Sequence, residues 1–233
     1  MYQEWKVLDL PFLFENDEHV EKVFNGQVGK DLLQKLDDKQ MKAMTFWSNG
    51  FKQMTSSKQP LLNPEDFKQQ RFRVMPGEVI IKQFKLLGAE PTAQSFNNVY
   101  HSLEIKALDG QENTISNIYS KGLYKVQQHL TLSNHGYLGY AVIMNAEFWN
   151  QLTPSQQKQI NSAMVETTKW IQDEARKMND SQLNEIQKNS SIQIHHLTSE
   201  QQNLWKNTFL PLYSQIEEEV GSKLLHDIQQ TKP

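Results

Sequence analysis

The chain has 233 residues, of which 37% are hydrophobic, 10% aromatic and 22% charged, as expected for a globular protein with one large domain or two lobes. Its net charge of -3 provides no excess positive field for nucleic acid or anionic lipid, so we expect neither as a partner. Cysteine is absent, which excludes disulfides, thiolate nucleophiles and cysteine-ligated metals.

The sequence carries no membrane or export signal that we can identify. Its apolar runs are far shorter than the roughly 20 residues of a membrane helix, so we expect no direct membrane insertion. Residues 1–14 lack the basic start, apolar core and small-residue cleavage site of a signal peptide.

Short apolar runs alternate with helical patterns along the first 145 residues. The predicted strands are residues 5–10, 41–47, 71–75, 91–95, 129–135 and 136–145. The predicted helices are residues 17–24, 29–38, 63–70, 78–88 and 97–108, followed by a short helix after residue 116. This alternation favours an α/β architecture with a largely parallel sheet, in which ligands gather at the carboxyl ends of strands.

Two turn signals interrupt this pattern. The Ser-Asn-Gly sequence at 48–50 is expected to end the strand at 41–47, and the Asp-Gly pair at 109–110 is expected to form a turn. The next three residues, 111–113, are a glutamine, a glutamate and an asparagine, which a simple surface turn does not need. This segment is therefore a candidate for binding.

The last third of the chain is dominated by one long helical pattern. Thr153 caps it, Pro154 opens it, and it continues to about Asn189. At 1.5 Å per residue it would be about 50 Å long, more than the width of a small domain, so we expect it to bridge two lobes. A strand at 191–197 and a final helix, bent or interrupted at Pro211, are expected to follow.

Arginine is rare in this chain, with three residues against 21 lysines. Two of the three, Arg71 and Arg73, lie in the predicted strand at 71–75. A guanidinium presents a planar fork that matches both oxygens of a carboxylate, which lysine cannot copy. An arginine pair in an otherwise apolar strand therefore suggests a specific role.

Seven segments, in this order, resemble the solute-binding proteins of tripartite ATP-independent periplasmic (TRAP) transporters, and most closely their dicarboxylate-binding (DctP-like) branch. They are "LPFLF", "WSNGFKQMTSSKQP", "RVMPGEV", "LGAEPTAQSFNNVYHSLE", "DGQENTISNIYS", "YKVQQHLTLSNHGYLGY" and "LTPSQQKQI". The resemblance covers essentially the whole chain. "DGQEN" following "RVMP" is its most specific combination.

The resemblance implies a two-lobed, hinged α/β binding protein of the periplasm, with a long lobe-spanning helix and no cofactor. Residues 1–49 plus 139–178 are expected to form lobe I, and residues 50–138 plus 179–233 lobe II. The protein would capture a small carboxylate-bearing solute and deliver it to membrane subunits that perform sodium-coupled uptake. Family members carry an export signal and a strand–helix–strand segment before "LPFLF", so we expect lobe I to be incomplete here.

The resemblance also assigns roles to individual residues. The arginine that pairs with the ligand carboxylate falls on Arg73, the asparagine on the other side of that carboxylate on Asn113, and a ligand-contacting aromatic residue on Phe96. Many relatives have an arginine where this chain has Lys52, which would keep a second anionic contact as a point charge.

Simpler interpretations stand beside these assignments. Arg73 could make a structural salt bridge or face solvent, and Arg71 is expected to be a surface or supporting residue, although it could face the cleft in place of Arg73. Glu112 is expected to pair within the protein, because a carboxylate is a poor ligand for another carboxylate.

Two further residues are weaker candidates for the cleft. Trp47 could line it, and Asn134 lies where the chain should cross between the lobes, so hinge packing is its default role and ligand contact the alternative. We assign no metal to His195 and His196, since no ligand partner is apparent at suitable spacing.

The leading hypothesis is a binding protein and not an enzyme, since no nucleophile elbow, phosphate loop, HExxH or paired-carboxylate motif is present. The alternatives are a truncated fragment that does not bind, and an enzyme whose site is scattered along the chain.

Overall fold

One six-stranded mixed sheet, with the strand order β3-β2-β4-β1-β5-β6, organises the computed structural model, which describes residues 3–37 and 40–231. The strands are β1 (Met41–Ser56), β2 (Arg71–Val74), β3 (Glu90–Ala93), β4 (Gly110–Thr114), β5 (His129–Asn145) and β6 (Gln193–His196). The α-helices are α1 (Asp17–Asn25), α2 (Gln27–Asp37), α3 (Glu78–Leu86), α4 (Val99–Glu104), α5 (Ile115–Ser120), α6 (Ala146–Gln151), α7 (Pro154–Asn189), α8 (Ser199–Thr208), α9 (Leu210–Val220) and α10 (Ser222–Gln230). Short 3-10 helices are η1 (Gln3–Asp9), η2 (Pro64–Phe67), η3 (Phe96–Asn98) and η4 (Leu123–Lys125).

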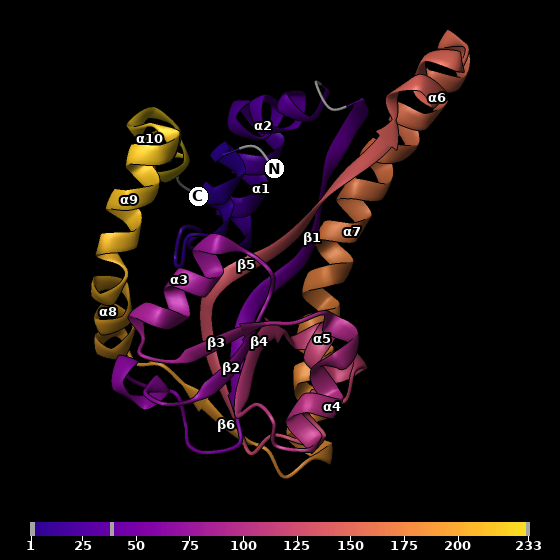
Figure 1. The fold of residues 1–233 in the computed structure, drawn as a ribbon. Coiled ribbons are helices and arrows are strands. Elements are labelled where there is room, and N and C mark those ends of the chain that lie inside the picture. Colours follow the sequence, from indigo (N-terminus) through magenta and orange to yellow (C-terminus); the bar gives the residue numbers. More distant parts are fainter. Residues whose placement is uncertain (1–2, 38–39, 232–233) are drawn as a thin grey trace.

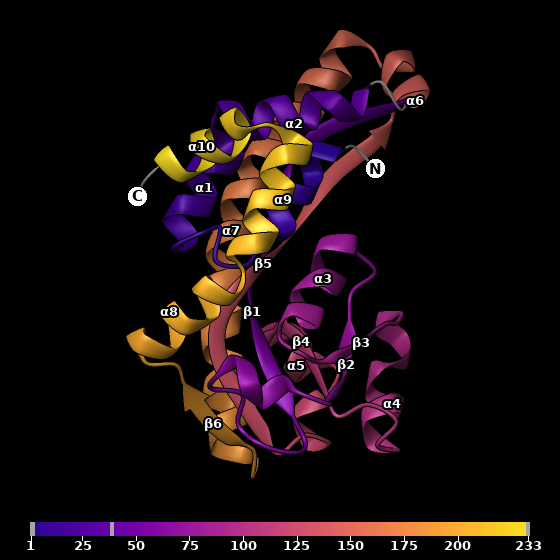
Figure 2. The same ribbon diagram turned by 60° about the vertical axis from the view of Figure 1, so that its left-hand side comes forward.

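The molecule has two halves, joined by β1, β5 and α7 (Figures 1 and 2). We call them the α1–α2 half, which also carries η1, α9 and α10, and the β2–β4 half, which also carries β6, α4 and α5. One buried cluster joins side chains of η1, α1, α2, α9 and α10, including Val7, Val20, Leu32, Leu212 and Ile228. Two other clusters fill the β2–β4 half on the two faces of its sheet.

The two strands that connect the halves are single long strands, so two predictions about them are wrong. We expected β1 to end at a turn over residues 48–50, but its pairing with β5 continues from Met41↔Asn145 to Ser56↔His129. Gly50, with φ of 139°, forms a bulge at this point instead of a turn. The predicted strands 129–135 and 136–145 are likewise one strand, β5.

The sheet is mixed and not largely parallel as predicted. β1 is antiparallel to both β4 and β5, whereas β2–β3, β2–β4 and β5–β6 are parallel. The physical reason lies in the connection between the halves. β1 carries the chain from one half to the other and β5 carries it back, so the two must run in opposite directions.

The predicted strand at 5–10 is also wrong, because this segment forms the 3-10 helix η1. Its buried residues Val7 and Leu10 are three positions apart, which places both on one side of a 3-10 turn. Most other predicted elements are confirmed, including β2, β6, α1 and α3; residue 38, at the end of the second predicted helix, lies outside the described residues. Two predicted helices are shorter than expected: the segment 63–70 contains only η2, and 97–108 holds α4.

The predicted long helix is confirmed as α7, and it spans both halves (Figure 1). Thr153 caps it, and a reciprocal bond with Gln156 completes a capping box. In the α1–α2 half its Thr168 accepts a hydrogen bond from the indole of Trp47, 3.1 Å away. At its other end Ile186 is fully buried in the core of the β2–β4 half.

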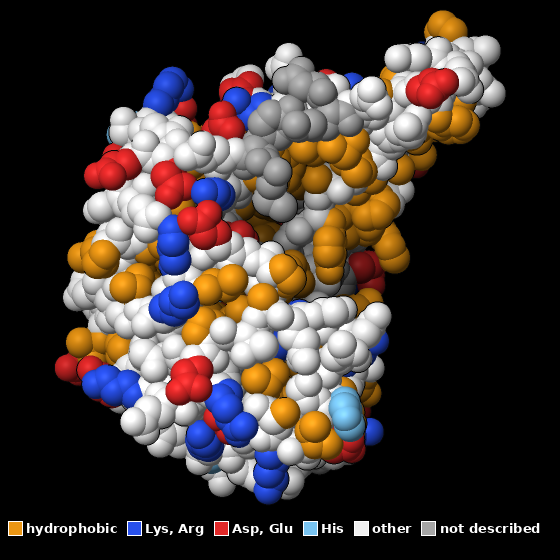
Figure 3. Space-filling view, in the orientation of Figure 1, with side chains coloured by type: hydrophobic (Ala, Val, Ile, Leu, Met, Phe, Trp, Pro, Cys, Tyr) orange, Lys and Arg blue, Asp and Glu red, His pale blue; other side chains and the backbone are white. Residues whose placement is uncertain are grey.

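Apolar side chains also gather on the surface, along the arm formed by α6, α7 and β5 (Figure 3). Exposed large apolar residues of these elements include Tyr140, Ile143, Phe148, Val165 and Trp170. In the described ranges of the chain, no helix combines the length and apolar character that a membrane span requires.

The packing of the C-terminal helices suggests a change to the expected lobe boundaries. Residues 1–49 and 139–178 were expected to form lobe I, and 50–138 and 179–233 lobe II. Because α9 and α10 share a core with η1 and α1, we propose that they belong to lobe I.

We predict that Gly110→Ala will destabilise the fold. Gly110 begins β4 in the middle of the sheet, and an added Cβ would clash with the Phe72 ring and lie 2.5 Å from the carbonyl oxygen of Thr55. Overpacking of this kind costs about 1–3 kcal/mol in free energy of unfolding, which urea denaturation would measure. The control is Gly77→Ala, whose Cβ would meet its nearest neighbour at 3.4 Å. Equal stability of the two variants would contradict the prediction.

Candidate ligand-binding site

Arg73 is the third residue of β2 and is only 2% exposed. Its Nε and Nη2 atoms donate to the backbone oxygen of Gln94, at 3.0 and 2.8 Å. Its Nη1 atom is buried and has no hydrogen-bond partner among the residues that the structure describes. Burial lowers the pKa of this guanidinium, and the charge of Glu112 opposes that shift. One side of the guanidinium is therefore fixed, and the other is left to an external acceptor.

Asn113 lies near Arg73 on the neighbouring strand. β2 and β4 are parallel with Arg73 opposite Gln111, so Asn113 is two residues farther toward the carboxyl end and on the same face. Its Oδ1 atom accepts from Nδ2 of Asn117 at 2.7 Å and from the Thr114 amide at 3.1 Å. Its own NH2 group donates to no residue in the described part of the chain. Two donors thus meet at the ends of adjacent strands, an arrangement that suits an anion.

Phe96 completes this group. It begins η3, and its ring centroid is 5.9 Å from the guanidinium carbon of Arg73. Lys121, at the end of α5, places its ammonium 5.4 Å from the same ring, close enough for a cation–π interaction. The structure therefore brings together Arg73, Asn113 and Phe96, and adds Lys121, which no sequence motif indicated.

A pocket lies between the halves, although none of Arg73, Asn113 and Phe96 lines it. The loop after β2 contributes Met75 and Pro76 to this pocket of about 220 Å³, whose other walls include Trp5 and Phe46 from the α1–α2 half. Figure 3 shows the surface indented between the block that carries α4 and α5 and the arm of α7 and β5. The pocket is thus linked to β2 through the loop that follows this strand, and not through Arg73 itself.

Lys52 lies on the other face of the sheet. In the β1–β4 register Lys52 is opposite Thr114, whereas Gln53 is opposite Asn113. Successive side chains of a strand point to opposite faces, so Lys52 lies on the face away from Asn113. Its ammonium is buried and bonds to both oxygens of Glu112, at 2.9 and 2.8 Å. The close approach needs Gly136, because a Cβ there would lie 2.7 Å from Lys52 Cε. Ligand contact by Lys52 stays a prediction, and its charge is already balanced internally.

Glu112 is the centre of a fully buried network, in agreement with its expected role as an internal partner. His135 Nε2 lies 2.9 Å from the second carboxylate oxygen, and its Nδ1 lies 2.8 Å from the Ser133 hydroxyl. Burial would raise the pKa of Glu112, but the charge of Lys52 and the hydrogen bond to His135 outweigh it, and the pKa is about 2. Glu112, the residue before Asn113, is thereby held by Lys52 and by His135.

Arg71 has the supporting role that we expected of it. It is exposed and pairs with Asp109, whose carboxylate also accepts from the Arg71 backbone amide at 2.8 Å and from Lys58 at 2.9 Å. Burial would raise the pKa of Asp109, but these partners hold it at about 2. The predicted Asp-Gly turn is wrong, because Gly110 already belongs to β4, whose five residues are all buried. The ion pair with Arg71 ties the start of β4 to β2.

Two predicted site residues lie elsewhere. Trp47 faces α7, where its indole bonds to Thr168, and Asn134 is exposed at the crossing between the halves, where its amide bonds to Gln53. The structure does not bring either residue to Arg73, and their contact with a ligand stays a prediction. His195 lies 3.2 Å from His129, and no group of three metal-ligating side chains occurs in the described ranges.

Comparison with known proteins gives this geometry a context. Residues 1–219 match the family of bacterial extracellular solute-binding proteins, family 7 (DctP). The chain belongs to this family. It is 45% identical over 225 residues to the C4-dicarboxylate-binding protein DctB of Bacillus subtilis, covering 97% of this chain and 64% of that protein. It is 36% identical to the C4-dicarboxylate-binding periplasmic protein DctP of Rhodobacter capsulatus, covering 96% and 67%.

Solved structures agree with the fold. A TRAP periplasmic solute-binding protein from Sulfurospirillum deleyianum with bound succinate has a TM-score of 0.93 at 38% identity, covering 98% of this chain and 75% of that one. The counterpart from Shewanella oneidensis, also with succinate, has a TM-score of 0.95 at 33% identity, covering 99% and 75%. The resemblance to TRAP solute-binding proteins and the two-lobed fold are therefore confirmed. These relatives are binding proteins and not enzymes.

The relatives are longer than this chain. It spans about two thirds of the length of the two curated relatives and three quarters of the two solved structures. What those whole proteins bind and assemble with is therefore a matter for proposal in this chain.

We predict that Glu112→Gln will destabilise the protein by about 3–5 kcal/mol at pH 7, because it leaves the buried Lys52 ammonium without a counter-charge. The folded-state pKa of Glu112, about 2, lies below its ordinary value of 4.5. Its stabilising effect is therefore complete above about pH 4.5 and is lost as the pH falls toward 2.

Urea denaturation between pH 7 and pH 3 checks this prediction. The difference in stability between the parent and Glu112→Gln should narrow below about pH 4.5. The control is Glu166→Gln, an exposed position on α7 where little change is expected. A difference that stays constant down to pH 3 would count against the proposed ionic network.

Proposed function

We propose that this chain is the extracytoplasmic solute-binding subunit of a TRAP-type secondary transporter. It captures a small organic acid, of the C4-dicarboxylate kind, in the periplasm and delivers it to membrane subunits that perform sodium-coupled uptake. The observation that carries this proposal is the buried Arg73 guanidinium, whose Nη1 atom lacks a partner among the described residues and lies beside Asn113 and Phe96.

A carboxylate would satisfy these groups together. One oxygen accepts from Nη1 of Arg73, and the NH2 group of Asn113 donates to the carboxylate from the neighbouring strand. A charge-assisted hydrogen bond of this kind is about twice as strong as a neutral one. Gln94 fixes the other side of the guanidinium, so little orientational freedom is lost on binding. The Phe96 ring packs against the carbon skeleton of the acid.

Closure of the two lobes would strengthen the same contacts. As the lobes exclude water, the local dielectric falls and each charged hydrogen bond gains energy. Arg73 is already buried in the conformation described here, and its Nη1 atom has no partner among the described residues, so without an anion this conformation carries a cost. Because an anion would remove that cost, ligand binding and the choice of conformation are coupled.

Relatives support the choice of ligand. Two are named for binding C4-dicarboxylates, two solved structures hold succinate, and one from Pseudomonas aeruginosa, 27% identical with a TM-score of 0.88, holds L-malate. Lys52 is proposed to support the site from the opposite face of the sheet, through its ion pair with Glu112. Trp47 and Asn134 are proposed as packing residues of α7 and the hinge.

The second candidate is a fragment of such a protein that does not bind its ligand. The observation that favours it is length, because the chain spans only 64% of the Bacillus subtilis relative. The parts of the relatives that it does not match would then be needed to complete the cleft.

A thermal-shift assay separates these candidates. We expect succinate, malate or fumarate to raise the melting temperature of the parent, since a ligand at 100 times its Kd stabilises by about 2.7 kcal/mol. A neutral analogue such as succinamide serves as control. A protein that melts cooperatively yet responds to none of the acids would favour the fragment.

We predict that Arg73→Lys will weaken binding of the responding acid by about 1.5–3 kcal/mol, roughly tenfold or more in Kd, because lysine cannot reproduce the oriented N–H donor. Isothermal titration calorimetry measures the change. The matched control is Arg71→Lys on the same strand, whose guanidinium is engaged by Asp109 and should leave Kd unchanged. If Arg71→Lys is the variant that loses affinity, the assignment of the two arginines must be reversed.

A further inference from the structure

The β1–β5 ladder has a gap where β5 crosses between the halves. Lys52 pairs with Gly136 and Met54 with Thr131, so the single residue Gln53 lies opposite residues 132–135 of β5. Within this loop Asn134 has φ of 46°, in the left-handed region. Backbone pairing is therefore missing at the point about which the halves would rotate.

The side chain of Gln53 takes the place of the missing ladder bonds. It is only 5% exposed. Its Oε1 atom accepts from the backbone amides of Ser133 at 2.8 Å and Asn134 at 3.1 Å. Its Nε2 atom donates to the Phe51 carbonyl at 3.2 Å and to Oδ1 of Asn134 at 2.6 Å. One amide of β1 thus binds the left-handed residue Asn134 and the residue before it.

The helix α7 is attached next to this point. Asn179 donates to the backbone oxygen of Asn49 at 2.8 Å and accepts from the amide of Ser116 at 2.9 Å. A Cβ on Gly50 would lie 2.8 Å from Asn179 Nδ2, so the bulge in β1 and the helix fit closely. The segment of β1 beside the gap at Gln53 is thus fixed to α7, whereas at the gap the pairing with β5 is absent.

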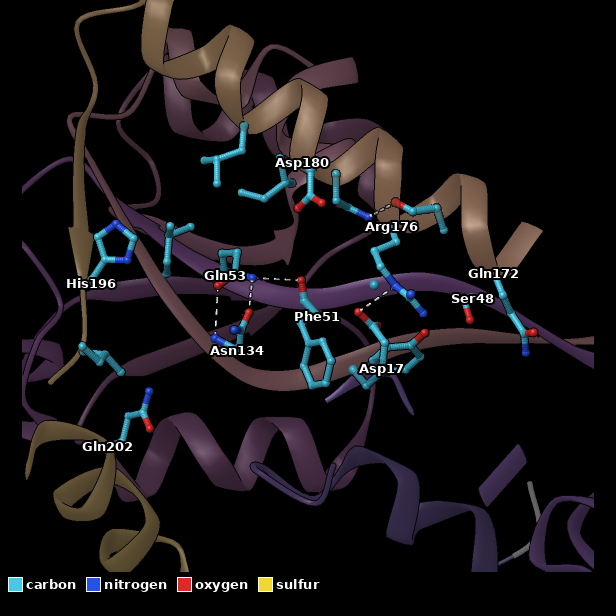
Figure 4. A pocket seen from close by; sticks show the side chains of 18 residues that line it. Asp17, Ser48, Phe51, Gln53, Asn134, Gln172, Arg176, Asp180, His196 and Gln202 are labelled. Carbon is cyan, nitrogen blue, oxygen red and sulfur yellow. Dashed lines mark hydrogen bonds and ion pairs between the residues drawn. The ribbon is translucent and has the colours of Figure 1, made fainter. Parts of the chain in front are cut away.

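A pocket of about 420 Å³ gives this region room to move. Figure 4 shows Gln53 and Asn134 at its middle, Asp17 and Arg176 toward one end, and His196 and Gln202 toward the other. These end walls come from the two different halves of the molecule. Any rotation of one half against the other must change the volume of the pocket.

From this geometry we infer that Gln53 is a positioning residue that sets the balance between open and closed arrangements of the lobes. Its amide holds β5 in the conformation described here, and rotation at Asn134 would break or exchange the three hydrogen bonds that it makes to β5. The inference rests on the proposed function, since closure over an organic acid is what Gln53 would regulate.

Two substitutions distinguish the hydrogen bonds that the Gln53 oxygen accepts from those that its nitrogen donates. Gln53→Glu keeps an oxygen that accepts from Ser133 and Asn134, but it loses both donated bonds. Gln53→Leu loses all four. The control is Gln202→Leu, which lies in the same pocket and whose side chain makes no hydrogen bond in the described part of the chain.

Distances between the lobes report the balance directly. Because the chain has no cysteine, Lys30→Cys on α2 and Glu104→Cys on α4 give two unique, exposed labelling sites, one in each half. Pulsed electron spin resonance of the ligand-free protein should show a broader distance distribution for both Gln53 variants than for the parent or Gln202→Leu. A distribution unchanged in both Gln53 variants would overturn the inference.

Hydrogen exchange at two amides provides an independent readout. The amides of Ser133 and Asn134 should exchange about fivefold to tenfold faster in Gln53→Leu, which corresponds to the loss of about one hydrogen bond, and near the parent rate in Gln53→Glu. Equal rates in the parent and Gln53→Leu would overturn the inference. If Gln53→Leu does not fold, Gln53→Glu and the distance measurement still decide.

Titration with succinate distinguishes this inference from the proposed function. If the parent binds succinate and the Gln53 variants change its Kd by about threefold or more while Gln202→Leu does not, both are supported. If the parent binds succinate but neither Kd nor distances respond to Gln53 substitution, only the inference about Gln53 fails. If no acid binds, the proposed function fails, and the ligand-free distances still test the role of Gln53.

Discussion

The Arg73 guanidinium is bonded on one side and open on the other, and the candidate site is built around this asymmetry. Gln94 holds Nε and Nη2 of Arg73, and β2 buries the side chain so that Nη1 can be satisfied only by an incoming acceptor. The neighbouring strand repeats this arrangement at smaller scale, since Asn113 has its oxygen engaged and its NH2 group available. The sheet therefore has two donors, Nη1 of Arg73 and the NH2 group of Asn113, that could serve an anion.

The other charged groups of the sheet hold β4, the strand that carries Asn113, against its neighbours. Asp109 ties the beginning of β4 to β2 through Arg71, and Glu112 ties its middle to β1 and β5 through Lys52 and His135. Each pair is internal, so neither competes with Arg73 for a ligand. Within the described part of the chain, Arg73 thus keeps a buried donor that these internal pairs do not use, which under the proposed function would limit how a carboxylate can bind.

The sequence was most informative where local chemistry decides the structure. The Thr153-Pro154 start predicted α7 correctly, and the motif around Arg73 identified a residue that is indeed buried and incompletely satisfied. It failed where distant contacts decide. Residues 48–50 resemble a turn, and become a bulge only because β5 pairs on both sides of them. Lys121 could not be anticipated, since its place beside Phe96 depends on how α5 packs.

The helix α7 also has a mechanical consequence. From Pro154 to Asn189 it contains no glycine and no second proline, so it has none of the residues at which helices usually kink. It is fastened to one half at Thr168 and to the other at Ile186. Under the proposed function, rotation of the halves about β1 and β5 would bend this continuous helix. Part of the binding free energy of the ligand would then be held as elastic strain and returned on release.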